Sequence, residues 1–173
     1  QQCAKFGANL AFTYQNDILL KRIEPLAKSV DSNLLIQCDV SEYLSVKNAA
    51  KKVKQMKKPL KAFINAAGVA SMNMAVTTDE NTVQKQIQTN LVGTIYCCQL
   101  FAPIMLRQKK GCFINFSTIA VELAIKGESI YAASKAGMIA MSKSLALEYA
   151  KKNIFINCVS PGFIKTNMTD KIS

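Results

Sequence analysis

A tyrosine and a lysine four positions apart are the residues of this sequence best suited to chemistry. Tyr131 and Lys135 stand in "SIYAASKAGM", which continues as "IAMSKSLALEYAKK". Ala, Ser, Lys and Met throughout this stretch favour a helix, and residues four apart lie one turn apart on one helix face. The pair is therefore either a solvated surface pair or a proton donor beside an ammonium group that lowers its pKa. The rest of the chain has to decide between the two.

The composition excludes several other chemistries. The sequence has no histidine, which rules out His-based zinc sites and a Ser-His-Asp triad. The six cysteines show no CxxC spacing and stand mostly in apolar runs, so we expect buried thiols of a reducing compartment rather than disulfides or a metal site. Any chemistry must therefore use Tyr, Lys, Ser, Thr or carboxylates.

The formal net charge of +11 comes almost entirely from lysine. Arg forks and interleaved aromatic residues, which read nucleic acids, are scarce, so we expect no nucleic-acid partner. Scattered lysines indicate a solvated face, and the positive field favours an anionic ligand such as a phosphorylated cofactor or an acidic carrier protein. No apolar run approaches the roughly 20 residues of a bilayer span, and the start lacks the pattern of a signal peptide. We expect a soluble protein of the cytoplasm or an organelle matrix, with no membrane partner.

Short apolar runs alternate with longer amphipathic ones along the chain. This alternation predicts parallel βαβ units in an α/β protein, with a Rossmann-type, doubly wound, three-layer sheet. With no repeats or linkers, residues 1–173 are expected to form a single domain. Strands are expected at 9–14, 33–40, 61–68, 112–117 and 154–162, and helices at 18–30, 44–56, 79–108 and 131–151.

Both ends of the sequence indicate an incomplete fold. The first expected strand, at 9–14, corresponds to the second strand of a Rossmann-type sheet, whose first strand lies at the centre. We therefore expect two parts to be absent: the central strand and the glycine-rich turn that follows it.

Three of the expected strands end in residues suited to a ligand. These ends are "NAAG" at 65–68, Ser117 with Thr118, and "SPG" at 160–162. Small residues let a flat ligand approach the backbone, and open α/β sheets bind ligands at the carboxyl ends of their strands. Their shared location favours the catalytic interpretation of Tyr131 and Lys135.

With these residues in view, the chain resembles the short-chain dehydrogenase/reductase family across nearly its whole length. The stretch "YAASKAGMIAMSKSLALEYAKKNIFINCVSPGFIKTNMTD" is most similar to 3-oxoacyl-(acyl carrier protein) reductases. The opening, "GANLAFTYQND" and "CDVSE", is more similar to enoyl-(acyl carrier protein) reductases. Those enzymes space tyrosine and lysine more widely than the three intervening residues here, so the catalytic spacing favours the ketoreductases.

The resemblance implies a role for each matching residue. Tyr131 is the general acid, and Lys135 lowers its pKa and binds the nicotinamide ribose. Asn90, in "IQTNLVG", holds a proton-relay water. Thr118, thirteen residues before Tyr131, replaces the family's catalytic serine, whereas Ser117 is one position too early and is expected to point to the other face of the strand. The cofactor positions are Asp39 and Val40 at the adenine, Asn65, Ala66, Ala67 and Gly68 in the turn, Pro161 and Gly162 after the last strand, and Ile164 and Thr166 at the carboxamide.

The cofactor choice depends on the end of the strand at 9–14. An acidic residue there would hold the ribose 2′-hydroxyl of NAD, but Tyr14, Gln15 and Asn16 carry no such charge. The sequence therefore favours NADP(H), with Gln15 as a contact, and NAD(H) remains an alternative because glutamine also accepts it.

The resemblance predicts an NAD(P)H-dependent oxidoreductase of fatty-acid synthesis that reduces the ketone of a 3-oxoacyl thioester. Its partner would be acyl carrier protein or a small acyl thioester. The alternatives are an enoyl-(acyl carrier protein) reductase, another short-chain alcohol or ketone dehydrogenase, and a catalytically inactive binding or scaffold homologue.

The helices at 79–108 and 131–151 carry more apolar surface than one sheet face needs. The resemblance predicts a homo-oligomer, a dimer or tetramer, joined through them. The resemblance also implies that the family's substrate-covering C-terminal segment is absent here, and burial of the two helices under that segment is the alternative.

Overall fold

A computed structural model describes residues 2–30 and 33–164 of the chain. The chain divides into two compact units, Gln1–Lys58 and Pro59–Ser173, which are treated separately below. The first unit holds α1 (Gln2–Lys5), β1 (Leu10–Tyr14), α2 (Asp17–Lys28), β2 (Asn33–Gln37) and α3 (Tyr43–Gln55).

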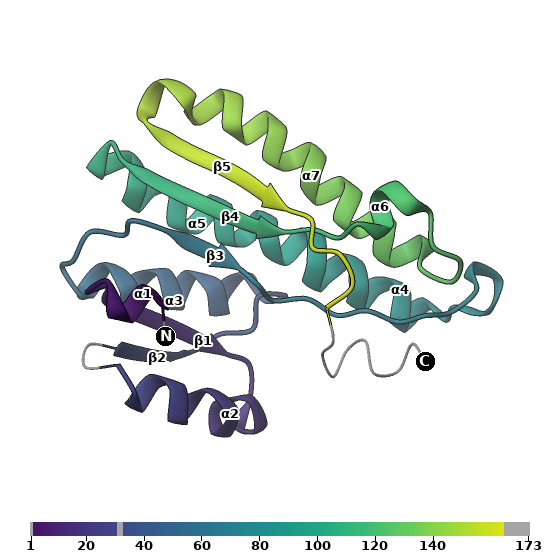
Figure 1. The fold of residues 1–173 in the computed structure, drawn as a ribbon, viewed down its shortest axis with the longest axis horizontal. Coiled ribbons are helices and arrows are strands. Elements are labelled where there is room, and N and C mark those ends of the chain that lie inside the picture. Colours follow the sequence, from purple (N-terminus) through teal and green to yellow (C-terminus); the bar gives the residue numbers. More distant parts are fainter. Residues whose placement is uncertain (1, 31–32, 165–173) are drawn as a thin grey trace. The chain divides into compact units, whose positions relative to one another are not determined.

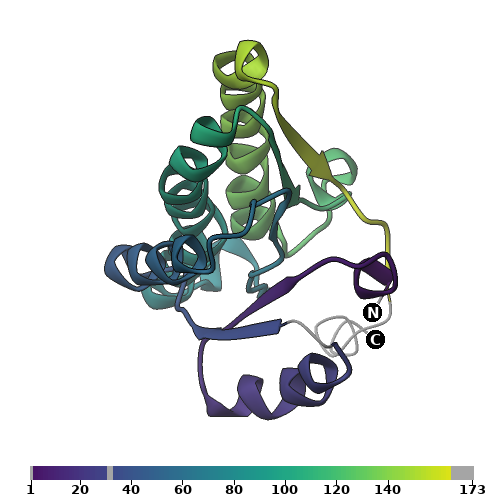
Figure 2. The same ribbon diagram turned by 90° about the vertical axis from the view of Figure 1, so that its left-hand side faces the viewer.

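In the first unit β1 and β2 form a parallel pair, with register from Leu10 opposite Asn33 to Tyr14 opposite Gln37. Figures 1 and 2 show α2 on one face of this pair and α3 on the other. The apolar stripe of α3 that includes Val46 and Ala49 is buried, as the 3.6-residue period predicts. The start of α2 is fixed by Asn16, whose side-chain oxygen accepts a hydrogen bond from the Leu19 N–H at 3.1 Å.

The second unit is built on a parallel sheet of three strands in the order β3-β4-β5. The helices α5 and α7 cover one face of this sheet (Figure 1; Figure 2). Phe63, Phe101 and Phe113 meet beneath them, with Phe63 ring centroids 4.3 Å from Phe101 and 5.7 Å from Phe113. The elements are β3 (Phe63–Asn65), η1 (Ala75–Thr77), α4 (Glu80–Ile87), η2 (Gln88–Val92), α5 (Gly93–Gln108), β4 (Gly111–Phe116), α6 (Ala120–Leu123), α7 (Ser129–Tyr149), η3 (Ala150–Lys152) and β5 (Ile154–Val159).

A chain of buried polar side chains ties the sheet to α7. Asn65 on β3 stands opposite Asn115 on β4, and its side-chain amide donates to the side-chain oxygen of Asn115 at 2.6 Å. The Asn115 amide in turn donates to the Ser142 hydroxyl of α7 at 2.8 Å. Because buried polar groups are costly when unpaired, these bonds fix the registry of helix on sheet.

The helical segment 80–108 is continuous but not regular. The elements α4, η2 and α5 follow one another directly, and η2 is a π-helical turn around Asn90. By length and hydropathy alone this segment passes the test for a membrane-crossing helix. Its buried residues, among them Cys97, Phe101 and Met105, pack inside the second unit, as expected of a core helix.

All nine expected strands and helices are present, and all strand pairs are parallel. The strands predicted at 33–40, 61–68 and 154–162 end earlier than expected, at Gln37, Asn65 and Val159. Among the described residues, β1 pairs with β2 in one sheet, and the other sheet has the order β3-β4-β5.

Candidate active site

The predicted catalytic pair lies on the first two turns of α7. Lys135 is 5% exposed, and its ammonium group donates a hydrogen bond of 2.6 Å to the Phe116 carbonyl at the end of β4. The Nζ atom lies 5.9 Å from the centroid of the Tyr131 ring, within the range of a cation–π contact. The two side chains are therefore a partly buried pair, not a solvated surface pair.

Burial lowers the pKa of Lys135 to about 8, against a weaker opposing influence of Cys158. A buried ammonium costs free energy, so the charged form is disfavoured relative to water. The Phe116 carbonyl supplies one acceptor for a group that carries three donors. The remaining N–H groups are available for a ligand hydroxyl.

The lowered pKa of Lys135 predicts a specific pH dependence of stability. The unfolded side chain has a pKa of about 10.4, so from about pH 8 to about pH 10 the unfolded state binds more protons than the folded state. The contribution of Lys135 to the free energy of unfolding therefore rises with pH across this window, by up to about 3 kcal/mol. We expect Lys135→Met to remove this rise, measured by urea unfolding across the same range.

Lys143→Met, which removes an exposed lysine from the same helix, is the matched control and should keep the wild-type slope. Equal slopes for wild type and Lys135→Met would contradict the buried state of the ammonium group.

The pKa of Tyr131 is raised by burial of the phenol first and by the nearby Glu128 carboxyl second. A hydrogen bond with the Thr118 hydroxyl acts in the opposite direction. The net direction is opposite to the one expected from a Tyr–Lys pair, because burial and the Glu128 carboxyl disfavour the phenolate more than the Thr118 hydrogen bond favours it. The phenol is thus held protonated, which is the form that a proton donor needs.

The two hydroxyls after β4 have different environments. Thr118 is half-buried, reaches the Tyr131 phenol and accepts a hydrogen bond from the Ala120 N–H at 3.1 Å. Ser117 is buried, and its hydroxyl has no hydrogen-bond partner in the described part of the chain. The structure therefore brings Thr118, and not Ser117, to the tyrosine.

Asn90 is completely buried at the π-helical turn. Its side-chain oxygen accepts from the Val69 N–H at 2.8 Å, and its amide donates to the Val69 carbonyl at 2.8 Å and to the Ser134 hydroxyl at 3.1 Å. Its own backbone carbonyl accepts from the Thr94 hydroxyl at 2.9 Å. The side chain predicted to serve a proton relay thus joins the loop after β3 to α7.

The turn after β3 leaves room for a ligand to approach its backbone at Gly68. Ala66 and Ala67 are exposed, whereas the Asn65 side chain is buried and engaged with Asn115. A Cβ atom at Gly68 would lie 3.3 Å from the Asn90 side-chain oxygen and 3.5 Å from the Lys135 ammonium. The glycine therefore leaves the space in front of the lysine open, which fits a flat ligand lying against this turn.

The turn after β5 is described as far as Ile164. The Pro161 carbonyl accepts from the Ile119 N–H at 3.2 Å, which ties this turn to the loop that follows Thr118. Gly162 borders open space, and Ile164 is exposed. Thr166 lies outside the described residues.

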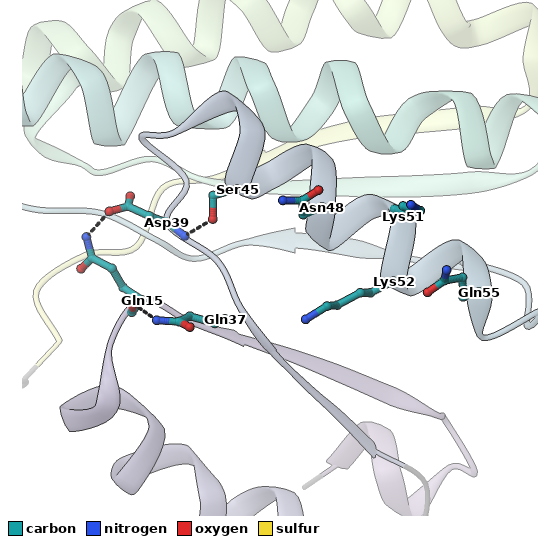
Figure 3. Close-up of a pocket in the computed structure, with 8 residues that line it drawn as sticks. All are labelled: Gln15, Gln37, Asp39, Ser45, Asn48, Lys51, Lys52 and Gln55. Atoms are coloured by element: carbon teal, nitrogen blue, oxygen red, sulfur yellow. Dashed lines mark hydrogen bonds between the residues drawn. The ribbon is translucent and has the colours of Figure 1, made fainter.

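The predicted adenosine contacts belong to the first unit. The Gln15 amide donates to the Asp39 carboxylate at 2.6 Å (Figure 3). Val40, the next residue, is half-buried. Burial opposes ionisation of Asp39, but hydrogen bonds from Ser41 and Gln15 leave its pKa lowered. Gln15 and Asp39 line a polar cavity of about 490 Å³. Six further residues line the cavity and were not predicted from the sequence: Gln37, Ser45, Asn48, Lys51, Lys52 and Gln55.

Ser134 and the Phe116 carbonyl were not predicted from the sequence either. Ser134 stands inside the quoted stretch "YAASK", but a hydroxyl in a helix gives no sign of a partner 44 positions away. A backbone carbonyl leaves no trace in residue types at all. Among the described residues, no group of His, Cys, Asp and Glu is arranged to hold a metal ion.

The chain is similar to a known protein family and to several known proteins. A family model described as enoyl-(acyl carrier protein) reductase matches residues 1–173. Carbonyl reductase family member 4 of Xenopus tropicalis is 37% identical over 143 residues, which are 83% of this chain and 61% of that protein. The 3-oxoacyl-[acyl-carrier-protein] reductase FabG of Staphylococcus aureus is 36% identical over 177 aligned positions, and the match covers 99% of this chain and 71% of that protein.

Solved structures show the same architecture. A short-chain dehydrogenase/reductase from Burkholderia xenovorans has a TM-score of 0.90 at 27% identity, covering 99% of this chain and 68% of its own. A short-chain dehydrogenase from Streptomyces avermitilis has a TM-score of 0.88 at 23% identity, and the match covers 96% of this chain and 62% of that protein. The predicted α/β fold of Rossmann type is thereby confirmed. The chain belongs to the short-chain dehydrogenase/reductase family and spans about three fifths of its relative from Xenopus tropicalis.

Proposed function

We propose that the protein is an NAD(P)H-dependent ketoreductase that converts a 3-oxoacyl thioester to the 3-hydroxyacyl thioester. The observation that carries the proposal is the Tyr131 phenol, hydrogen-bonded to Thr118 and set beside the buried Lys135 ammonium. The name of the S. aureus relative supports 3-oxoacyl reduction, and the name of the X. tropicalis relative supports carbonyl reduction in general.

The arrangement suits protonation of a nascent alkoxide. The hydroxyls of Tyr131 and Thr118 are close enough to donate to one substrate carbonyl oxygen, which polarises the carbonyl. A reduced nicotinamide held at this site would supply the hydride to the carbonyl carbon. Tyr131 then transfers its proton to the carbonyl oxygen, and the Lys135 ammonium stabilises the phenolate that remains. Solvent returns the proton to Tyr131.

The residues fit a nicotinamide cofactor. The open space in front of Gly68 and the free donors of Lys135 suit a ribose with two hydroxyls. Asn65, Ala66, Ala67 and Gly68, with Pro161, Gly162, Ile164 and Thr166, are proposed for the nicotinamide end, and Gln15, Asp39 and Val40 for the adenosine end. The end of β1 and the two residues after it, Tyr14, Gln15 and Asn16, carry no carboxylate, so we propose a preference for NADPH over NADH, measurable as the ratio of the two kcat/KM values.

Enoyl reduction is the second candidate, and the description of the matching family model favours it. Tyr131 and Lys135 one helical turn apart favour ketone reduction. An inactive binding homologue and a dehydrogenase of another small alcohol or ketone are the remaining candidates.

A spectrophotometric assay of the whole protein distinguishes them. NADPH consumption with an acetoacetyl thioester and none with a crotonyl thioester is expected. Consumption with only the crotonyl thioester would assign enoyl reduction. Cofactor binding without turnover of either thioester or of simple ketones would assign a binding homologue.

We further propose acyl carrier protein as the substrate carrier, the cytoplasm or an organelle matrix as the location, and a homo-oligomer joined through residues 79–108 and 131–151. Leu147 on α7 is 82% exposed, and Ile95 on α5 is also exposed, which leaves apolar surface for a second subunit. Light scattering of the whole protein at micromolar concentration should show a dimer or tetramer, and a monomer would overturn this part.

A further inference from the structure

The buried hydroxyl of Ser134 donates one hydrogen bond and accepts another. The residue is 0% exposed on α7, one position before Lys135. Its hydroxyl donates to the Tyr131 carbonyl at 2.7 Å and accepts from the Asn90 amide at 3.1 Å. The one hydroxyl thus joins the backbone of the first turn of α7 to the π-helical turn η2.

Asn90 extends this connection to the loop after β3. Two further hydrogen bonds of 2.8 Å hold its side chain to both backbone groups of Val69. Its backbone is held as well, by the Thr94 hydroxyl. Because each bond is buried, breaking one leaves an unpaired polar group that costs about 1–3 kcal/mol.

The connected groups border the catalytic pair. The Asn90 side-chain oxygen and the Lys135 ammonium both face the empty side of Gly68, at 3.3 and 3.5 Å from the position of a Cβ atom. The Ser134–Asn90 hydrogen bond is therefore a direct side-chain link between the helix that carries Tyr131 and Lys135 and the elements that hold the Gly68 turn.

We propose that Ser134 is a positioning residue, which sets the first turns of α7, and so Tyr131 and Lys135, against the turn at Gly68. Its effect on turnover rests on the proposed ketoreductase function, whereas its effect on the surroundings of Tyr131 does not. Ser134 itself touches neither the phenol nor the ammonium group in the hydrogen bonds described, and it acts through the backbone of Tyr131 and through Asn90.

Ser142 is the matched control for a purely structural role. It lies on the same helix, is 3% exposed and accepts one buried hydrogen bond of 2.8 Å from the Asn115 amide. Ser134→Ala and Ser142→Ala each remove a buried hydroxyl and should destabilise the protein to a similar extent. Only Ser134→Ala should disturb the catalytic pair.

The first readout is the titration of Tyr131, followed by NMR with tyrosine labelled at Cζ and assigned with Tyr131→Phe. Burial is the main cause of the raised pKa of Tyr131, and Glu128 and Lys135 are the charged groups placed beside it. A loosened first turn admits water, so Ser134→Ala should lower the midpoint by about half a pH unit or more, and Ser142→Ala should leave it unchanged. This readout needs no substrate, so it tests the proposal even if the wild type turns over no ketone.

The second readout is kinetic. Ser134→Ala should lower kcat about 10-fold with little change in KM for the cofactor, as expected when a reacting group is displaced by a fraction of an ångström. Ser134→Cys, which keeps the size and has only a weak donor and acceptor, replaces it should the alanine variant fail to fold. An unchanged Tyr131 midpoint in the Ser134 variants, or an equal shift in Ser142→Ala, would overturn the proposal.

Discussion

Tyr131→Phe is expected to lower ketone reduction about 10³-fold or more while leaving cofactor affinity almost unchanged. The substitution removes only the phenolic oxygen, and the ring keeps its packing and its contact with the Lys135 ammonium. The other hydroxyls of the described site belong to serine and threonine, which are far weaker acids than a phenol, so no residue is placed to take over the proton transfer.

Tyr149→Phe is the matched control, because Tyr149 is the last residue of the same helix and is half-buried. It should keep the wild-type rate. Cofactor affinity is measured by fluorescence titration and turnover by NADPH consumption. Retention of most of the rate by Tyr131→Phe would show that the proposed proton donor is wrong.

Thr118→Val is expected to lower the rate about 10²-fold. Valine has nearly the shape of threonine but no hydroxyl, so the variant loses the hydrogen bond to the Tyr131 phenol and one donor to the substrate carbonyl. Loss of that bond also removes the influence that lowers the pKa of Tyr131, so the titration midpoint of Tyr131 should rise.

Ser117→Ala is the control for this prediction, since it removes the adjacent hydroxyl. That hydroxyl is buried and has no hydrogen-bond partner among the described residues, so the variant should lose little activity. The kcat values of Ser117→Ala and Thr118→Val show which variant loses more activity. A larger loss in Ser117→Ala than in Thr118→Val would assign the catalytic hydroxyl to Ser117.

Elements with a clear hydrophobic period were predictable from the sequence, and their ends were not. The α3 stripe around Val46 and the presence of a strand at β4 follow from the pattern of apolar residues alone. The strand predicted at 61–68 ends at Asn65 because Ala66 and Ala67 leave the sheet, although their residue types suit a buried strand equally well. The residues mistaken for strand are those proposed to contact the cofactor.

The different directions of the Ser117 and Thr118 hydroxyls were predictable from local strand geometry. Strand alternation predicted that Ser117 and Thr118 point in different directions, and the buried Ser117 and half-buried Thr118 agree with this. The raised pKa of Tyr131 was beyond such reasoning, because it depends on burial by residues distant in the sequence. The same holds for the π-helical turn at Asn90, since the apolar period of residues 79–108 gives no sign of an interruption.

The most direct test of the proposed reaction follows the transferred atoms. The whole protein is incubated with an acetoacetyl thioester and NADPH that carries deuterium at the transferred position, and the product is analysed by mass spectrometry and NMR. The account predicts a 3-hydroxybutyryl thioester with one deuterium on the carbon that bears the hydroxyl, and almost none formed by Tyr131→Phe. Deuterium in a saturated acyl chain, or equal product formation by Tyr131→Phe, would contradict it.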